Sequence, residues 1–357
     1  MSTISKTENT EMSQVAGRGA EREAPRIVII KRSSLGDIIH AMPVACALRE
    51  TYPDAYIAWV VETRFEQVLD GHSALDEIIA VRHPLENPLK VISDLRTIYR
   101  ELHSRHFDWA IDLQGLLKSA VVLMLSGASR KIGIEGHQRE LSNLIVNEQV
   151  SPHGQIHAVE YYLAVARHLG AAPEKITFGL AVDPEAAQWT NTFLADHGMR
   201  DGRPLVGINP TTARADKEWE PARFVQAANS IQGVNWIITG APSDRELAEA
   251  IAGGIDGPAA VTAGHTDIAR LVALINRLDL LVSCDSGPLH IAVALDIPTI
   301  ALFGPTNPHL TGPIGDIHTV LWHKNPDSDG TPGPHLGSMD DITVDEVVEA
   351  LRNLLRA

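Results

Sequence analysis

The sequence predicts an α/β protein built from two Rossmann-like domains that face each other across a cleft. Short runs of β-branched and other apolar residues alternate with stretches of helical periodicity, and this alternation is typical of a parallel sheet covered by helices on both faces. The alternation occurs in two series, which are separated by a stretch rich in Gly and Pro. At 357 residues, the chain is long enough for two domains with a core each.

The first series begins with a strand expected at 26–31 (RIVIIK), which is followed by the turn SSLGD and an apolar helix at 38–52. Further strands are expected at 56–61, 78–81 and 109–113, with helices at 94–104 and 115–125. We expect this series to form an N-terminal domain at 26–182. A polar segment at 1–25 precedes it, and we interpret that segment as a disordered tail.

The second series has strands expected at 205–209, 235–239, 280–284 and 299–303, with helices at 221–231, 244–252, 267–276 and 288–295. We expect it to form a C-terminal domain at 200–342, followed by a C-terminal helix within 343–357. Pro184, Gly198, Gly202 and Pro204 mark the region in which the two domains should join.

The composition excludes several classes of protein. A net charge of −15 argues against nucleic-acid binding, which requires a basic face. No apolar run approaches the roughly 18 residues of a membrane helix, and residues 1–25 lack the apolar segment of a secretory signal. Cys46 and Cys284 lie in apolar stretches without a CxxC partner, so we expect reduced thiols and a cytoplasmic protein. Peripheral attachment to the inner membrane stays open.

The first expected strand leads into a candidate catalytic turn. Ligands of open α/β sheets bind at the carboxyl ends of the strands, where Gly36 would let the backbone approach a ligand closely. Asp37 would lie at the helix start, where a carboxylate is favoured by the helix dipole. It could act as a base, or it could only cap the helix. Neither GxGxxG nor the Walker motif GxxxxGK[ST] occurs here, so NAD binding and ATP hydrolysis lack support.

Two strand ends of the second series offer groups for a diphosphate. Thr211, Thr212 and Lys217 follow one strand and could supply hydroxyl donors and an ammonium, unless they belong to an ordinary surface loop. The run Asp285-Ser286-Gly287-Pro288 follows another strand and predicts a helix start, whose free N–H groups bind anions. His290 lies one turn further on and could be only a packed polar residue.

The remaining polar positions have weaker signals. Asp244 follows a strand and could hold a ribose hydroxyl or cap the next helix, and Gln114 and Lys118 could face an acceptor. Asp327 and Asp329 match a metal-binding DxD pattern but lie in a Gly- and Pro-rich loop, and the pair His103 and His106 has no third ligand nearby. We therefore expect no metal and no other cofactor.

Taken together, these motifs resemble the heptosyltransferases of lipopolysaccharide core synthesis, which are inverting GT-B enzymes of glycosyltransferase family 9, and the pattern is closest to heptosyltransferase I. The motifs that carry the resemblance span about residues 26–308 in the family's order: KRSSLGDIIHAMP, DLQGLLKSA, the HAVE of His157–Glu160, PTTARADKEW, GAPSDRE, CDSGPLHIAVAL and GPTNP. The resemblance implies a donor, ADP-L-glycero-D-manno-heptose, and an acceptor at the membrane surface, Kdo-lipid A. It places the acceptor on the N-terminal domain and the nucleotide sugar on the C-terminal domain.

The resemblance also assigns roles to individual residues. It maps the catalytic aspartate to Asp37 and the diphosphate lysine to Lys217. The expected donor-binding residues are Thr211, Thr212, Asp244, Thr266, Asp285, Ser286, Gly287 and His290, and the expected acceptor-binding residues are Ser34, Gly36, His40, Gln114 and Lys118. Two positions depart from the family: Asp244 stands where Glu is common, and Thr266 where a larger apolar residue often packs near the adenine.

The expected reaction is a single displacement with inversion, in which Asp37 accepts the proton of the acceptor hydroxyl and ADP leaves from the opposite face. Charge on the diphosphate would be stabilised by Lys217, Thr212 and the helix start at 287–289, without a metal. Two alternatives remain open at this point. One is a related GT-B glycosyltransferase with another nucleotide sugar or glycan acceptor, and the other is a catalytically silent nucleotide-binding module.

Overall fold

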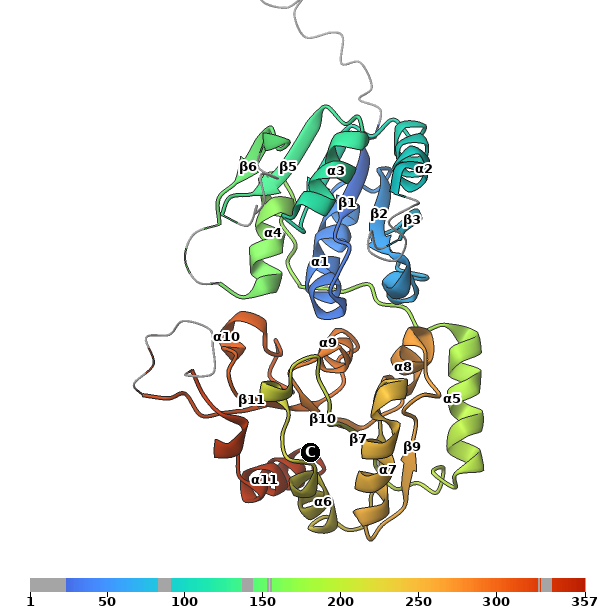
Figure 1. Cartoon of the computed structure of the whole chain (residues 1–357), viewed down its shortest axis with the longest axis vertical. Helices are drawn as coiled ribbons and strands as arrows, with labels where there is room; N and C mark the ends of the chain where they lie inside the picture. The colour runs from blue at the N-terminus through green and yellow to red at the C-terminus, as the bar shows by residue number, and fades with distance from the viewer. Residues whose placement is uncertain are drawn as a thin grey trace, which may run out of the picture.

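The computed structural model describes residues 24–82, 91–136, 144–152, 154, 156–326, 328 and 336–356. The chain forms two α/β lobes, which lie one above the other in Figure 1. The N-terminal lobe contains one six-stranded sheet with helices α1–α4, and the C-terminal lobe contains a second six-stranded sheet with helices α5–α11. Within the described ranges, no helix is both long and apolar enough to cross a membrane.

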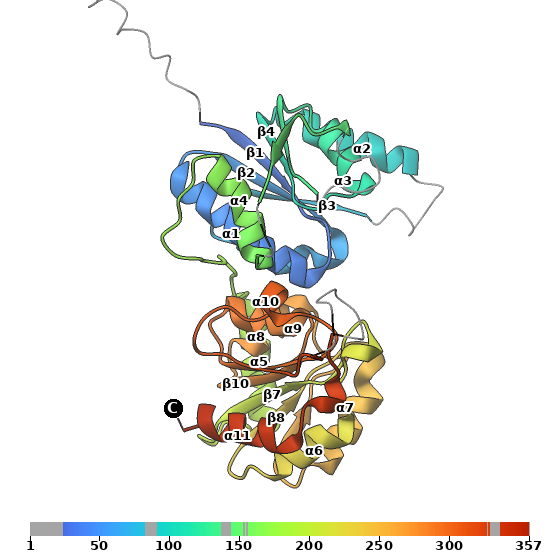
Figure 2. The same ribbon diagram turned by 90° about the vertical axis from the view of Figure 1, so that its left-hand side faces the viewer.

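The N-terminal sheet is parallel, with the strand order β3-β2-β1-β4-β5-β6. Its strands are β1 (Arg26–Ile30), β2 (Tyr56–Glu62), β3 (Glu77–Val81), β4 (Trp109–Asp112), β5 (Arg130–Ile134) and β6 (Glu148–Val150). Helices α1 (Leu35–Thr51) and α4 (Ala158–His168) cover one face, and α2 (Val91–His103) and α3 (Leu117–Leu125) cover the other (Figure 2). The order of the strands reverses between β1 and β4, which is where such sheets bind ligands.

The C-terminal sheet repeats this topology in the order β12-β11-β10-β7-β8-β9. Its strands are β7 (Leu205–Asn209), β8 (Asn235–Ile238), β9 (Ala259–Val261), β10 (Leu280–Cys284), β11 (Thr299–Phe303) and β12 (Thr319–Trp322). One face packs against α5 (Pro184–Asp196), α8 (Ile268–Ile275) and α9 (Gly287–Ala294), and the other against α6 (Pro221–Asn229), α7 (Arg245–Gly254) and α11 (Val344–Leu354). Short 3-10 turns follow β2, β7 and β8: η1 (Thr63–Val68), η4 (Ala215–Lys217) and η5 (Pro242–Asp244). A single helical turn, α10 (Pro308–Thr311), follows β11.

The predicted fold class, two Rossmann-like domains of parallel sheet and helix, is confirmed. Strands β7, β10 and β11 begin and end where the sequence predicts. The sequence analysis did not predict the strand β5, the short edge strands β6, β9 and β12, or the helices α4 and α5. Helix α5 lies inside the expected boundary region and packs against α8, while residues 1–23 of the expected tail lie outside the described residues.

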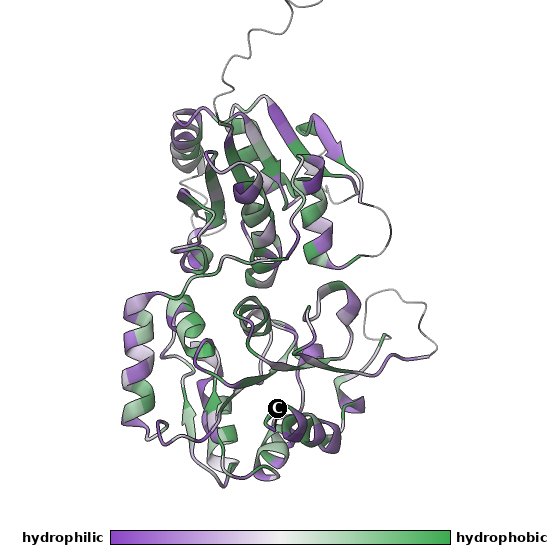
Figure 3. Ribbon diagram, turned by 180° about the vertical axis from the view of Figure 1, so that it is seen from behind, coloured by the Kyte–Doolittle hydropathy of each residue, from purple (hydrophilic) through white to green (hydrophobic). Residues whose placement is uncertain are grey.

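The apolar core is continuous between the lobes. Hydrophobic residues concentrate on the strands and on the helix sides that face them (Figure 3). One cluster of buried side chains includes Ile38 and Ile39 of α1, Val159 of α4, Ile275 of α8 and Ile291 of α9. Because burial of apolar surface is the main stabilising contribution to folding, this shared cluster holds the two lobes against each other.

Two glycines allow the first turns of α1 and α9 to touch across the lobe boundary. A Cβ atom on Gly36 would lie 2.5 Å from Cδ2 of His290, and a Cβ atom on Gly287 would lie 2.7 Å from Cδ2 of Leu35. Real carbon atoms do not approach this closely without displacement, because packed interiors have little free volume. Each helix therefore has a glycine in its first turn where the other lobe leaves no room for a side chain.

We expect Gly36→Ala to lower the free energy of unfolding by about 1–3 kcal/mol, because the added methyl group overpacks the contact between α1 and α9. Chemical denaturation of the purified variant measures this change. Gly253→Ala is the matched control, since a Cβ atom at this position of α7 meets nothing within 4 Å. Alanine should leave stability there unchanged or raise it by up to about 1 kcal/mol. Equal unfolding midpoints for the two variants would contradict the close approach of the helices.

Candidate functional site

A cavity of about 800 Å³ lies between the lobes, at the carboxyl ends of both sheets. The N-terminal lobe contributes the first turn of α1 and Phe65 of η1, while the C-terminal lobe contributes the segments that follow β7, β8, β9, β10 and β11. Strand ends from two sheets thus open into one space. This is the position where α/β folds place their ligands.

Most of the site residues predicted from the sequence line this cavity. They are Ser34, Gly36, Asp37, His40, Thr211, Thr212, Lys217, Asp244, Thr266, Asp285, Ser286, Gly287 and His290. Asp37 and Lys217, which come from opposite lobes, share the cavity as the hypothesis of a common site requires. The individual roles given to these residues stay predictions.

Asp37 caps the start of α1 and also faces the cavity. Its Oδ2 atom accepts hydrogen bonds from the backbone N–H of Ser34 (3.1 Å) and from the Ser34 hydroxyl (2.7 Å), so the carboxylate caps the first turn of α1. The side chain is still 46% exposed and lines the cavity, which leaves it accessible to a ligand. Burial alone would raise the pKa of Asp37, but the Lys31 ammonium and the Ser34 hydrogen bonds outweigh it and hold that pKa below its usual value.

Lys31 is a buried cation behind the carboxylate. Its Nζ atom lies 4.0 Å from Oδ1 of Asp37, and it donates to the Leu113 carbonyl (3.1 Å) and the Tyr162 hydroxyl (2.9 Å). Burial lowers the pKa of Lys31, an effect opposed by the negative charges of Asp37 and Asp112. The ammonium does not line the cavity, so it acts on Asp37 from inside the N-terminal lobe.

Lys217, on the opposite wall, is paired with a carboxylate. Its Nζ atom lies 2.7 Å from Oδ2 of Asp285, which also accepts a hydrogen bond from the Thr306 hydroxyl (2.8 Å). The Nε2 atom of His290 lies 3.7 Å from the other carboxylate oxygen of Asp285. The ammonium and the buried carboxylate therefore compensate each other at the start of α9.

Side-chain hydrogen bonds join the loops of this wall. The amide of Asn209, the last residue of β7, donates to the Ser286 hydroxyl (2.9 Å) and the Thr211 carbonyl (3.1 Å). Asp244 accepts hydrogen bonds from the Thr211 hydroxyl and the Ala241 N–H group, each at 2.8 Å. The segments after β7, β8 and β10 are therefore fixed relative to one another.

Three histidines meet where the lobes join. The ring of His40 lies 4.3 Å from that of His290 and 5.6 Å from that of His157, both in edge-to-face orientation. His157, the N-cap of α4, accepts a hydrogen bond from Val159 N–H at Nδ1, and its Nε2 lies 2.9 Å from the carbonyl of Gly312 in the other lobe. Burial lowers the pKa of all three rings, so the cluster is uncharged at neutral pH.

Gln114 and Lys118, which the sequence analysis predicted to face an acceptor, are not among the residues that line the cavity. The Gln114 side-chain oxygen accepts hydrogen bonds from the N–H groups of Arg32 (2.9 Å) and Ser33 (3.1 Å). Lys118 donates to the Ser33 hydroxyl (3.0 Å) and to Glu62 (2.9 Å). Both side chains hold the segment between β1 and α1 that presents Asp37.

A model of glycosyltransferase family 9 (heptosyltransferase) matches residues 95–331. The chain belongs to this family. The predicted glycosyltransferase activity and the resemblance to lipopolysaccharide core heptosyltransferases are thereby confirmed.

Named relatives of this glycosyltransferase agree with the family match. It is similar to lipopolysaccharide core heptosyltransferase OpsX of Haemophilus influenzae, with 26% identity over 93% of this chain and 98% of the relative. It is also similar to lipopolysaccharide heptosyltransferase 1 of Escherichia coli K12, with 29% identity over 83% of this chain and 92% of the relative. The solved structure of E. coli heptosyltransferase WaaC with ADP superposes with a TM-score of 0.76 at 26% identity, covering 92% of this chain and 99% of that one, and the fold is GT-B as predicted.

The cavity of this glycosyltransferase also contains residues that the sequence analysis did not single out. Phe65, Ile268 and Leu271 form an apolar part of the lining, while Asn209 and Thr306 supply hydrogen bonds. Asn209 lies at the end of β7, and Thr306 lies shortly after β11. Polar residues at the carboxyl ends of strands often contribute to binding sites, so both could have been predicted from the sequence. The apolar residues carry no such signal, since similar residues occur throughout the core.

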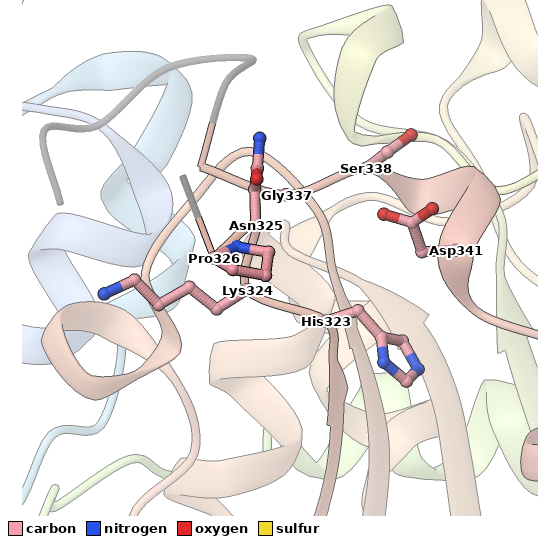
Figure 4. Close-up of a pocket in the computed structure, with 7 residues that line it drawn as sticks. All are labelled: His323, Lys324, Asn325, Pro326, Gly337, Ser338 and Asp341. Carbon is pink, nitrogen blue, oxygen red and sulfur yellow. The ribbon is translucent and has the colours of Figure 1, made fainter. Parts of the chain in front are cut away.

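A second hollow of about 460 Å³ lies on the C-terminal lobe, and Figure 4 shows the side chains around it. His323, Lys324, Asn325 and Pro326 line one side of it, and none of the predicted site residues takes part. Among the described residues, no group of three or more His, Cys, Asp or Glu side chains could hold a metal ion. Asp327 and Asp329 lie outside the described residues, and the His103 ring stacks on Tyr99 at 5.0 Å.

We expect Lys31→Met to raise the pKa of the Asp37 carboxyl, because an ammonium 4.0 Å away no longer favours the ionised form. Titration of the carboxyl carbon by NMR measures this pKa directly. Tyr162→Phe is the control, since it removes a hydrogen-bond partner of Lys31 but keeps the cation. An unchanged Asp37 titration in Lys31→Met would show that the buried ammonium does not act on the carboxylate.

Proposed function

We propose that this glycosyltransferase transfers heptose from ADP-L-glycero-D-manno-heptose to a Kdo hydroxyl of Kdo-lipid A, with inversion and without a metal. In this proposal the N-terminal lobe binds the acceptor, and the C-terminal lobe binds the nucleotide sugar. The observation that carries it is the single cavity that Asp37 and Lys217 line from opposite lobes. The proposed reaction belongs to the synthesis of the lipopolysaccharide inner core, and it is supported by relatives that are named as lipopolysaccharide heptosyltransferases.

The choice of donor rests on the family and on one solved relative. The family is described as that of the heptosyltransferases, and the structure of E. coli WaaC was determined with ADP. The cavity offers matching chemistry, because apolar side chains at 65, 268 and 271 suit a nucleobase while hydroxyl groups at 211 and 212 suit phosphate oxygens.

Asp37 is the proposed general base. Its carboxylate faces the cavity and its Oδ1 atom has no short hydrogen bond to the described residues, so this oxygen can accept the proton of an incoming hydroxyl. A carboxylate with a lowered pKa is a weak base toward a free alcohol. The hydroxyl becomes acidic, however, as its oxygen bonds to an oxocarbenium-like carbon, so the proton is transferred late in the displacement.

In this proposal, groups on the opposite wall of the cavity stabilise the leaving group. Lys217, the hydroxyl groups of Thr211 and Thr212, and the Gly287 N–H group at the start of α9 can stabilise the negative charge that develops on ADP. The base and this anion site lie in different lobes, which favours attack and departure on opposite faces of the anomeric carbon. Such an arrangement gives inversion at the anomeric carbon. In this proposal, protein groups rather than a metal ion stabilise the negative charge of the diphosphate.

We expect the purified protein to transfer heptose from ADP-heptose to Kdo-lipid A in the presence of EDTA, at a rate equal to that without the chelator. Mass spectrometry of the acceptor detects the added heptose. GDP- and UDP-sugars in parallel reactions test the alternative of another donor. Loss of transfer in EDTA would refute metal independence, and preferential use of another donor or acceptor would refute the proposed substrates.

We expect Asp37→Ala to reduce kcat by about 10²–10⁴, the usual contribution of a general base, while the affinity for ADP stays unchanged because ADP binds the other lobe. Single-turnover kinetics and titration calorimetry measure the two quantities. Asp37→Asn is the matched control for the cap, since its amide oxygen can still accept the hydrogen bonds from Ser34. Near-native turnover in both variants would remove Asp37 from the mechanism.

A further inference from the structure

One turn of the N-terminal lobe reaches the C-terminal wall of the cavity. This turn, η1, packs against α8, and the side-chain amide of Gln67 lies 3.4 Å from Oδ2 of Asp267, the N-cap of α8. Phe65 of η1 lines the cavity together with Ile268 and Leu271 of α8. Among the lining residues that the structure describes, Phe65 is the only Phe, Tyr or Trp. The lobe that carries the proposed base therefore also contributes a large apolar ring to the cavity.

The order of the strands in the C-terminal sheet gives the cavity a polar end and an apolar end. The strands lie in the order β10, β7, β8 and β9. The segments that follow them present, in the same order, Asp285, Lys217, Asp244 and then Ile268 with Leu271. Neighbouring strands lie about 5 Å apart, so the β9 end is about 10 Å from the β7 end. This separation matches the span from the diphosphate of a nucleotide to its base.

The β9 end of the cavity is apolar on the sides of both lobes. Ile268 and Leu271 belong to the C-terminal lobe, and the partly buried Phe65 belongs to the N-terminal lobe. The guanidinium of Arg64 lies over the Phe65 ring, 4.6 Å from its centre, so a ligand can contact only the other face or the edge of the ring. Flat ligands such as nucleobases gain affinity from contacts of this kind, whereas a phosphate group or a sugar hydroxyl gains little.

We propose that Phe65 contacts the nucleobase of the donor, so that the N-terminal lobe completes the donor site. This inference rests on the proposed function, which places the diphosphate beside Lys217. The C-terminal lobe binds the diphosphate and the ribose, and Phe65 adds a contact to the base from the other lobe. The bound nucleotide then bridges η1 and α8, and its affinity depends on a side chain of the lobe that also carries Asp37.

Phe65→Ala tests this contact with ligands that have or lack the base. We expect the variant to bind ADP about tenfold more weakly than wild type, as for loss of stacking between a base and an aromatic side chain. Its affinity for ribose 5-diphosphate, which is ADP without the adenine, should be unchanged. Phe65→Tyr keeps the ring and should bind ADP as wild type does. Titration calorimetry with the full chain measures each affinity.

Gln67→Ala is the matched control for the contact between the lobes. Gln67 is an exposed residue of the same turn and does not line the cavity, so alanine removes its contact with Asp267 but keeps the Phe65 ring. We expect unchanged ADP binding in this variant. A loss equal to that of Phe65→Ala would overturn the inference. So would unchanged ADP binding in Phe65→Ala, or an equal loss of ADP and ribose 5-diphosphate binding.

Phe65→Leu keeps the inference testable if the alanine variant does not fold. Leucine retains most of the apolar volume but has no ring, so we expect ADP binding to weaken about threefold, as for loss of the specific aromatic contribution. Binding of ribose 5-diphosphate should again be unchanged. Equal ADP affinities of wild type and Phe65→Leu would then overturn the inference.

Failure of the proposed function can be separated from failure of the Phe65 contact. If the wild type binds ADP but transfers no heptose to Kdo-lipid A, the proposed function is refuted, and the titrations with ADP and ribose 5-diphosphate still decide the role of Phe65. If the wild type binds GDP or UDP instead of ADP, the proposed donor is refuted, and the same variants are titrated with the nucleotide that binds. If none of the three nucleotides binds, both proposals are refuted.

Discussion

The contact between the first turns of α1 and α9 is the constraint on which the site depends. Each turn belongs to a different lobe, and each contains a glycine whose missing side chain makes room for the other lobe. The close approach brings Asp37 and the start of α9 onto one cavity, and the shared apolar cluster behind them stabilises the arrangement. If the lobes stood further apart, the strand-end motifs would remain intact but would no longer face a common ligand.

Charge is distributed differently on the two walls of the cavity. On the N-terminal side, Lys31 is buried behind Asp37 and favours its ionised form, while the carboxylate itself stays accessible. The neutral histidine cluster lies between the walls, where uncharged rings can pack without the cost of burying ions. On the opposite wall, the Asp285 carboxylate is buried and pairs with the Lys217 ammonium.

The sequence predicts the fold and the polar strand-end residues of the cavity because both follow from local rules. Buried parallel strands are short apolar runs, and polar residues directly after them gather at one edge of the sheet, as Asp37, Thr211 and Asp285 do. Edge strands such as β6 are short and partly polar, so their pattern does not separate them from loops. Packing across the lobes is equally hidden, since nothing local to Phe65 or His157 indicates a partner in the other lobe.

The pairing of Lys217 with Asp285 affects which anions the cavity attracts. The Lys217 ammonium already has a carboxylate partner at 2.7 Å, so a small anion meets an ion pair whose two charges largely offset each other. A diphosphate that spans the cavity would carry more negative charge and could contact the Gly287 N–H group as well as the Lys217 ammonium. The internal ion pair therefore weakens the attraction of the cavity for simple anions relative to ligands that make several contacts.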